Sequence, residues 1–240
     1  MDPVIIQNLF SRPKPEKIAI VLDTCIEMEN SDCINEPQLF THKKRYDHLK
    51  RAIEIFALSK SQMTENHEYS LLTLDDSAHI VSPFDSSTDH FRDILAQVAP
   101  YSYAETCNLN SIFEVLGNEL EISQEELPYA LHIILIYGRN LQVPIISQIN
   151  ELLAHRDVYF DAVYIHGKDS TPFHEEISKT INSLILDPDR KFSYFFEVKN
   201  DASKLYQAFS LLTGHVQQRC NQKMHEELIN QQLNGGKKRR

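Results

Sequence analysis

The residues with the clearest potential for chemistry follow a short apolar run near the start of the chain. Residues 18–22 predict a buried strand that leads into Asp23, and Cys25 and Glu27 follow at two-residue intervals. An aspartate at the carboxyl end of the first strand of an α/β sheet lies where such folds bind ligands. Asp23 could therefore contribute to a Mg²⁺ site, which needs oxygen ligands in near-octahedral geometry. Because Cys25 offers a thiol instead, the spacing predicts a site that cannot hold the metal.

Other patterns that would supply catalytic or cofactor chemistry are missing from the sequence. The six glycines form no G-x-G-x-x-G loop, and neither G-x-S-x-G nor H-E-x-x-H occurs. Gly167-Lys-Asp-Ser170 is similar to part of a phosphate-binding loop, but Ala162 stands where that loop needs its first glycine. We interpret this segment as a polar loop after a strand. We therefore expect no cofactor and no enzymatic activity.

The elements that would position Asp23 alternate between strands and helices. Apolar runs predict strands over 18–22, 69–74, 78–81, 129–137, 158–165 and 192–196. Helical spacing and cap residues predict helices over 46–57, 89–98, 109–120, 144–154, 173–185 and 202–212. Asp75-Asp-Ser77 separates two of the strands by a tight hairpin turn. This alternation is typical of an α/β domain with a mostly parallel sheet and helices on both faces.

The composition of the chain limits the classes of partner that it is expected to bind. The 240 residues carry a net charge of −10, and without the basic end at Lys237–Arg240 the remainder carries −14. Nucleic-acid binding needs clustered lysine and arginine, so we expect no nucleic-acid partner. Four cysteines without C-x-x-C spacing favour reduced thiols in a cytosolic or nuclear protein. No run approaches the roughly 18 apolar residues of a membrane span, and the first residues do not read as a signal peptide, so we expect no membrane partner.

The residues around Asp23 resemble the von Willebrand A domain, whose metal site begins Asp-x-Ser-x-Ser at this location. Cys25 and Glu27 replace the two serines. The resemblance also assigns Thr106 to the domain's threonine position, and Tyr137 to the position of an aspartate after the central strand. It implies a von Willebrand A-like fold with a degenerate metal site. A site rebuilt from Asp23 and Glu27, with or without Thr106, is the alternative.

The chain is expected to have three parts: an extended arm over 1–16, a von Willebrand A-like domain over 17–213, and a C-terminal segment over 214–240. The predicted core is complete by Leu212, and an apolar stripe beyond it predicts docking on a partner subunit. The candidate partner-binding residues are Val216, Arg219, Met224, Leu228, Ile229 and Leu233. A helix folded back on its own domain is the alternative. The basic end is either an import signal or a solvated tail.

Several segments together resemble the MERIT-forty family, the von Willebrand A-like subunits of BRISC deubiquitinase assemblies. The best match is Phe160-Asp-Ala-Val-Tyr-Ile-His166, and Glu105–Leu109 and His132–Arg139 match in kind and order. The resemblance implies a non-catalytic scaffold that directly binds and stabilises the BRE-like subunit, which has ubiquitin-conjugating-variant domains. Through that complex the chain would join an Abraxas-like scaffold and a zinc metalloprotease that cleaves lysine-sixty-three-linked ubiquitin. Cytoplasmic and nuclear localisation would follow.

Two other functions stay open at this point. The chain could be a metal-dependent ligand-binding von Willebrand A domain, in which case Mg²⁺ would raise its melting temperature. It could also be a von Willebrand A-like subunit of a nuclear transcription or repair complex, which the co-purifying partner would reveal.

Overall fold

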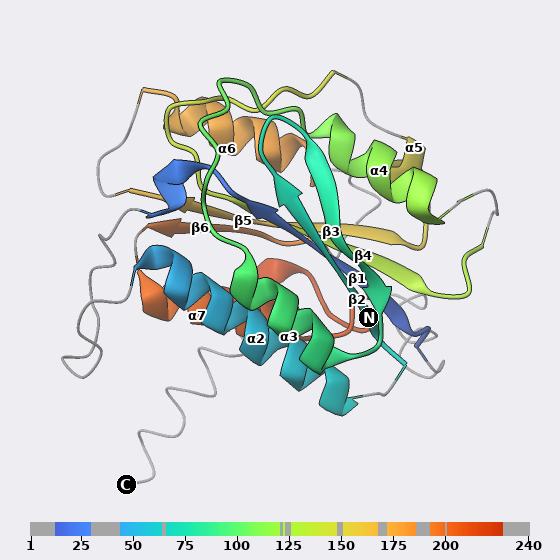
Figure 1. The fold of residues 1–240 in the computed structure, drawn as a ribbon. Helices are drawn as coiled ribbons and strands as arrows, with labels where there is room; N and C mark the ends of the chain where they lie inside the picture. The colour runs from blue at the N-terminus through green and yellow to red at the C-terminus, as the bar shows by residue number, and fades with distance from the viewer. Residues whose placement is uncertain are drawn as a thin grey trace, which may run out of the picture.

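Six strands form one sheet in the order β3-β2-β1-β4-β5-β6 (Figure 1). The structure, a computed structural model, describes residues 13–29, 44–63, 66–120, 122, 126–147, 151–167, 172–185, 193–199 and 201–227. The strands are β1 (Glu16–Asp23), β2 (Glu68–Leu74), β3 (Ala78–Asp85), β4 (Ala130–Tyr137), β5 (Val158–His166) and β6 (Phe195–Lys199). Neighbouring strands are parallel except β2 and β3, which form the antiparallel hairpin predicted at Asp75-Asp-Ser77.

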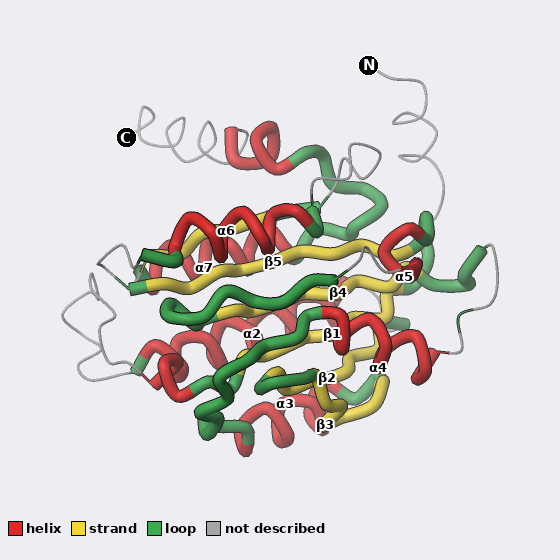
Figure 2. Tube along the Cα trace, turned by 90° about the horizontal axis from the view of Figure 1, so that it is seen from above, coloured by secondary structure: helices red, strands yellow, loops and turns green. Residues whose placement is uncertain are grey.

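Helices cover both faces of this sheet. They are η1 (Ile26–Glu29), α2 (Arg45–Met63), α3 (Thr88–Gln97), α4 (Asn110–Leu120), α5 (Glu151–Ala154), α6 (His174–Ser183) and α7 (Ala202–Leu212). α2, α3 and α7 lie on one face, and α4, α5 and α6 on the other (Figures 1 and 2). The predicted α/β class, with a mostly parallel sheet between two helical layers, is confirmed.

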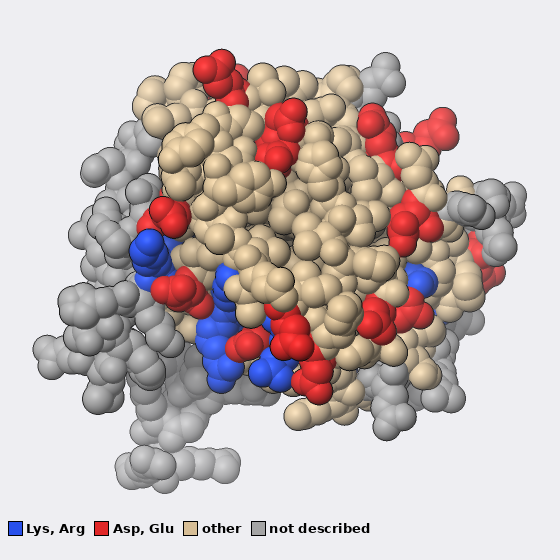
Figure 3. Space-filling view, in the orientation of Figure 1, with Lys and Arg blue, Asp and Glu red and all other residues tan. Residues whose placement is uncertain are grey.

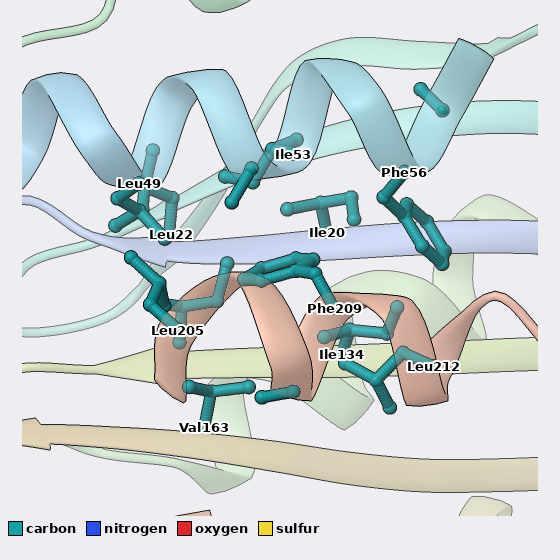
Figure 4. Packing of buried hydrophobic residues seen from close by; sticks show 14 of the residues in the cluster. Ile20, Leu22, Leu49, Ile53, Phe56, Ile134, Val163, Leu205, Phe209 and Leu212 are labelled. Carbon is teal, nitrogen blue, oxygen red and sulfur yellow. The ribbon is translucent and has the colours of Figure 1, made fainter. Parts of the chain in front are cut away.

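Successive side chains of a strand point to opposite faces, and this divides the interior into two cores. In β1, Ile20 and Leu22 enter the core beneath α2 and α7, whereas Val21 enters the opposite core. Figure 4 shows the first core, where α2 and α7 pack side by side on the sheet. Phe56 of α2 meets Phe209 of α7 edge to face, with 6.0 Å between the ring centroids. Burial on both faces explains why the central strands are continuous apolar runs.

Several predicted bounds differ from the structure: β6 begins three residues later than predicted, and α2 continues six residues beyond its predicted end. The helix predicted over 144–154 is present only as α5, and residues 144–147 are not helical. Ile145 instead lies extended beside Asn108, where the Ile145 N–H donates to the carbonyl of Cys107 at 2.7 Å. β3 runs four residues beyond its predicted end and contains Pro83. An edge strand tolerates proline because its outer N–H groups need no partner strand.

The predicted N-terminal arm lies mostly outside the described residues, and its last residue, Glu16, belongs to β1. No helix in the described part of the chain is both long and apolar enough to cross a membrane.

Candidate functional site

Asp23, at the carboxyl end of β1, is fully buried and surrounded by donors. The Cys25 N–H donates to Oδ1 at 3.0 Å, and the Gly138 N–H donates to Oδ2 at 3.1 Å. Nε of Arg139 donates to Oδ1 at 3.1 Å and to Oδ2 at 3.4 Å. Arg139 is itself 0 % exposed, so the two residues form a buried ion pair.

The Arg139 guanidinium also joins three loops at this edge of the sheet. Nη1 donates to the carbonyl of Thr106 at 3.1 Å and to Oε1 of Gln142 at 2.6 Å. Nη2 donates to the carbonyl of Asp75, which begins the β2–β3 hairpin. Arginine presents five N–H donors in a fixed planar geometry, which suits a role at the junction of several loops.

These residues do not fit a divalent cation. Burial raises the pKa of the Asp23 carboxyl, while Arg139 and the N–H groups of Cys25 and Gly138 oppose that rise. The hydrogen bonds to its oxygens come from N–H groups, and these bonds favour the charged carboxylate against the effect of burial. A Mg²⁺ ion would need these same oxygens, and the Arg139 guanidinium already supplies positive charge beside them.

The substituted positions serve the fold. Cys25 is buried, its backbone pairs with Ser102, and burial raises the pKa of its thiol. Oε2 of Glu27 accepts hydrogen bonds from the backbone N–H of Asn140 at 2.9 Å and from its side-chain amide at 3.3 Å. Cys25 and Glu27 therefore stabilise the loops that follow β1 and β4.

Thr106 and Tyr137, at the other two positions, also contact neighbouring loops. Thr106 contributes its backbone carbonyl to Arg139, and its side chain is exposed. The Tyr137 hydroxyl donates to the carbonyl of Gln142 at 2.7 Å. Within the described residues, the three-residue group that could hold a metal is Asp75, Asp76 and His79 on the hairpin, so Asp23 and Glu27 form no such group with their neighbours.

Sequence reasoning did not identify Arg139 as the partner of Asp23. The available signal was a basic residue two positions after the most apolar strand of the chain. An arginine in such a buried setting needs a carboxylate partner, and Asp23 ends the neighbouring strand.

A second buried network ties the C-terminal segment to the sheet. Nη1 and Nη2 of Arg219 donate to the two carboxylate oxygens of Asp161 in β5, both at 2.7 Å. Nε2 of His132 lies 2.6 Å from Oδ2 of Asp161, and the Tyr194 N–H donates to Oδ1 at 2.7 Å. Burial alone would raise the pKa of Asp161, but Arg219 and His132 outweigh that effect and hold it at about 2.

Glu16 connects the same segment to β1. Its carboxylate pairs with Lys60 of α2 and accepts the Val216 N–H at 3.1 Å. Burial opposes ionisation, but Lys60 and nearby histidines lower the pKa of Glu16 from 4.5 to about 2. Glu16 and Lys60 are both 0 % exposed.

These networks correct part of the predicted partner-binding set. Val216 is 0 % exposed and Arg219 is 6 % exposed, so both belong to the interior of the domain rather than to a docking surface. The physical reason is the buried Asp161 carboxylate, whose charge is neutralised by Arg219. Met224 is 53 % exposed, and its docking role stays a prediction. Leu228, Ile229 and Leu233 lie outside the described residues.

Proteins named BRISC and BRCA1-A complex member 1 are similar to this chain over most of its length. The Danio rerio protein is 25% identical over 219 residues, which cover 85% of this chain and 58% of the relative. The Xenopus tropicalis protein is 26% identical over 220 residues, covering 85% and 67%. The Homo sapiens protein is 25% identical over 219 residues, covering 85% and 65%.

The chain is therefore similar to BRISC and BRCA1-A complex member 1 at about a quarter of the aligned positions. It spans 58% of the Danio rerio relative and 67% of the Xenopus tropicalis relative, so a substantial part of each relative has no counterpart in it. No protein-family model matches the chain.

Solved structures identify the fold of the chain. The VWA domain of SpRpn10 superimposes with a TM-score of 0.55 at 14% identity, covering 86% of this chain and 98% of that domain. The PilB minor pilin from Streptococcus sanguinis gives a TM-score of 0.59 at 12% identity, covering 87% of this chain and 63% of the pilin. The predicted von Willebrand A-like fold is confirmed.

Proposed function

We propose that the chain is a non-catalytic scaffold subunit of a BRISC-type deubiquitinase assembly, in which it directly binds and stabilises the BRE-like subunit. The observation that carries the proposal is the similarity of 85% of the chain to proteins named as members of such complexes. The buried ion pair of Asp23 and Arg139 supports it, because it occupies the edge where a von Willebrand A domain would bind metal and ligand.

A non-enzymatic role agrees with the described residues of the site. Asp23 is fixed by Arg139, Glu27 by Asn140, and burial raises the pKa of the Cys25 thiol, so none is available as a nucleophile or general base. The Abraxas-like scaffold and the zinc metalloprotease are proposed as indirect partners, reached through the BRE-like subunit.

Co-expression with the BRE-like subunit of the same organism tests the proposal. We expect a stoichiometric complex that survives size exclusion, and a higher melting temperature of the BRE-like subunit in that complex, because binding stabilises the native state. Failure of the two purified proteins to associate at micromolar concentration would contradict the proposed partner.

A second assay addresses catalysis. The purified chain alone should leave lysine-sixty-three-linked ubiquitin chains intact on a gel, with and without a chelator. Chelator-sensitive cleavage by the purified chain would contradict the scaffold role. For localisation, we propose both cytoplasm and nucleus, and fractionation of cells that express the tagged full chain is the test.

A further inference from the structure

Three loops meet at the carboxyl ends of the parallel strands and form one surface, which we call the carboxyl-edge surface. Its segments are 75–77 between β2 and β3, 99–109 before α4, and 138–147 after β4. The Asn108 N–H donates to the carbonyl of Asp76 at 2.8 Å, and the Ile145 N–H donates to the carbonyl of Cys107 at 2.7 Å. These bonds connect all three segments.

The carboxyl-edge surface gathers exposed apolar side chains. Among the described residues, the large hydrophobic side chains that remain exposed include four on two of these loops. Tyr101 is 56 % exposed, Tyr103 78 %, Leu141 67 % and Ile145 50 %. Scattered exposed apolar residues are ordinary, but a group on adjoining loops is typical of a protein interaction site.

Buried hydrogen bonds fix the loops that carry these side chains. The buried Arg139 guanidinium contacts one residue in each segment, namely Asp75, Thr106 and Gln142. The N–H groups of Tyr101 and Ser102 both donate to the carbonyl of Thr24, at 2.9 and 3.0 Å. Such a fixed surface loses little conformational entropy when a partner binds.

The charge of the carboxyl-edge surface is negative. Its acidic residues are Asp75, Asp76 and Glu105, and its one basic side chain, Arg139, is 0 % exposed. On the side of the molecule drawn in Figure 3, the upper half shows mostly uncharged residues with acidic residues among them and no Lys or Arg. Opposite charge on a partner would therefore favour both encounter and register.

We propose that the carboxyl-edge surface binds a basic segment of a partner protein. Apolar side chains of that segment pack on Tyr103 and Leu141, and its lysine or arginine side chains face Asp76 and Glu105. A second copy of this chain is a poor occupant, because each copy carries a net charge of −10 and presents the same acidic loops. This inference is independent of which subunit the scaffold binds, since it concerns the chemistry of one surface.

Three fluorescent fifteen-residue peptides test the proposal on the full chain by anisotropy at low salt: one of arginine and leucine, one of glutamate and leucine, and one of arginine and serine. The arginine–leucine peptide should bind at least tenfold more tightly than the other two. Replacing Tyr103→Ser together with Leu141→Ser should weaken that binding at least tenfold. Asp76→Lys with Glu105→Lys should do the same and reduce its dependence on salt.

Matched controls separate this surface from general effects of charge and apolarity. Ile55→Ser with Met63→Ser removes two exposed apolar side chains of α2, and Asp93→Lys with Glu119→Lys makes the same charge change on α3 and α4. Both control variants should bind the arginine–leucine peptide within twofold of the original chain. The proposal would be overturned if the control variants lost as much binding as the surface variants, or if the acidic peptide bound as tightly as the arginine–leucine peptide. It would also be overturned if the arginine–leucine peptide did not bind below millimolar concentration, or if the chain formed a dimer that Tyr103→Ser dissociated.

Discussion

Arg139 supplies at this sheet edge the positive charge that a divalent cation supplies in a metal-binding von Willebrand A domain. The guanidinium differs from a metal because it is covalently fixed and its donors point in set directions. Unlike a bound ion, it cannot exchange with solvent. Asp23 and Arg139 therefore form a structural junction of three loops.

The first prediction is that Arg139→Met strongly destabilises the protein. It would leave the fully buried Asp23 carboxylate without its guanidinium partner, which typically costs about 3–5 kcal/mol. Urea unfolding monitored by circular dichroism measures the loss. The double variant Asp23→Asn with Arg139→Met should recover a large part of it, because no buried charge remains. A loss below about 1 kcal/mol in Arg139→Met would show that the ion pair is not needed.

The second prediction concerns metal binding at Asp23. Calorimetric titration of the full chain with Mg²⁺, Mn²⁺ and Ca²⁺ should give no micromolar site that depends on Asp23, because its oxygens already accept hydrogen bonds from Arg139, Cys25 and Gly138. Asp75→Asn with Asp76→Asn is the control for any weak binding at the exposed hairpin group. A stoichiometric site abolished by Asp23→Ala would contradict the prediction.

The third prediction is a loss of stability in acid. The folded-state pKa values of Glu16 and Asp161 are about 2, below their ordinary values of 4.5 and 3.8. Carboxylates with lowered pKa contribute stability that is fully present above their unfolded pKa and is lost as pH falls towards the folded pKa. The free energy of unfolding should therefore decrease between about pH 4.5 and pH 2, by roughly 2–3 kcal/mol for each carboxylate.

Urea unfolding at several pH values measures this decrease. Asp93→Asn changes an exposed carboxylate on α3 and should leave the shape of the profile unaltered. A flat profile between pH 5 and pH 3 would show that Glu16 and Asp161 do not contribute through their charged forms.

At the scale of elements, the sequence pattern predicted those strands and helices whose formation depends on local interactions. The alternation of apolar runs with helical spacing located the first five strands, since burial on both faces leaves a plain signal in β1, β4 and β5, whereas the sixth strand was predicted three residues too early. The segment around Ile145 was predicted incorrectly because its conformation depends on Asn108 and Cys107, which are distant in sequence. The spacing of apolar residues within a segment does not depend on such a long-range contact, so it cannot predict one.

The same distinction applies to the site. The position of Asp23 at the end of β1 followed from the apolar run before it, and a degenerate metal site was inferred from Cys25, Glu27 and Tyr137. The ion pair with Arg139 was not predicted, because it joins residues 116 positions apart. Arg219 was assigned to a partner for a related reason: Asp161, its buried counterpart, lies inside an apolar strand and gives no hint of which cation it needs.

The fourth prediction is that truncation after Gly214 destabilises the fold. It removes Val216, which is fully buried, and Arg219, which pairs with Asp161. Burying a large apolar side chain contributes about 1.5–3 kcal/mol, and leaving a buried carboxylate without its partner costs about 3–5 kcal/mol. Thermal unfolding of the truncated chain should therefore begin tens of degrees lower, or the chain should fail to fold.

Truncation after Glu227 is the matched control. It retains Val216 and Arg219 and removes only residues beyond the described part, so we expect a melting temperature within a few degrees of the full chain. If the chain ending at Gly214 were as stable as the chain ending at Glu227, the C-terminal segment would be a free docking element, as the sequence first suggested.

At the scale of the whole molecule, the two cores depend on one sheet. Ile134 of β4 belongs to the core under α2 and α7, while Ile133 and Leu135 belong to the core under α4 and α6. Each face is closed by helices from distant parts of the chain, and β1 and β4 pair with each other at the centre. Loss of helix packing on one face of the sheet would therefore destabilise the strands on which the helices of the other face also pack.

The fifth prediction is that the protein unfolds as one cooperative unit. Phe56→Ala opens a cavity in the core under α2 and α7, and Phe160→Ala opens one in the opposite core, each at a cost of about 3–5 kcal/mol. In both variants the midpoint should shift for the whole molecule, with circular dichroism and tyrosine fluorescence giving coincident urea transitions. The ten tyrosines and the lack of tryptophan make tyrosine the natural fluorescent probe. Two separated transitions in either variant would show instead that the two helical layers unfold independently. The shared sheet would then not couple the stability of the two cores.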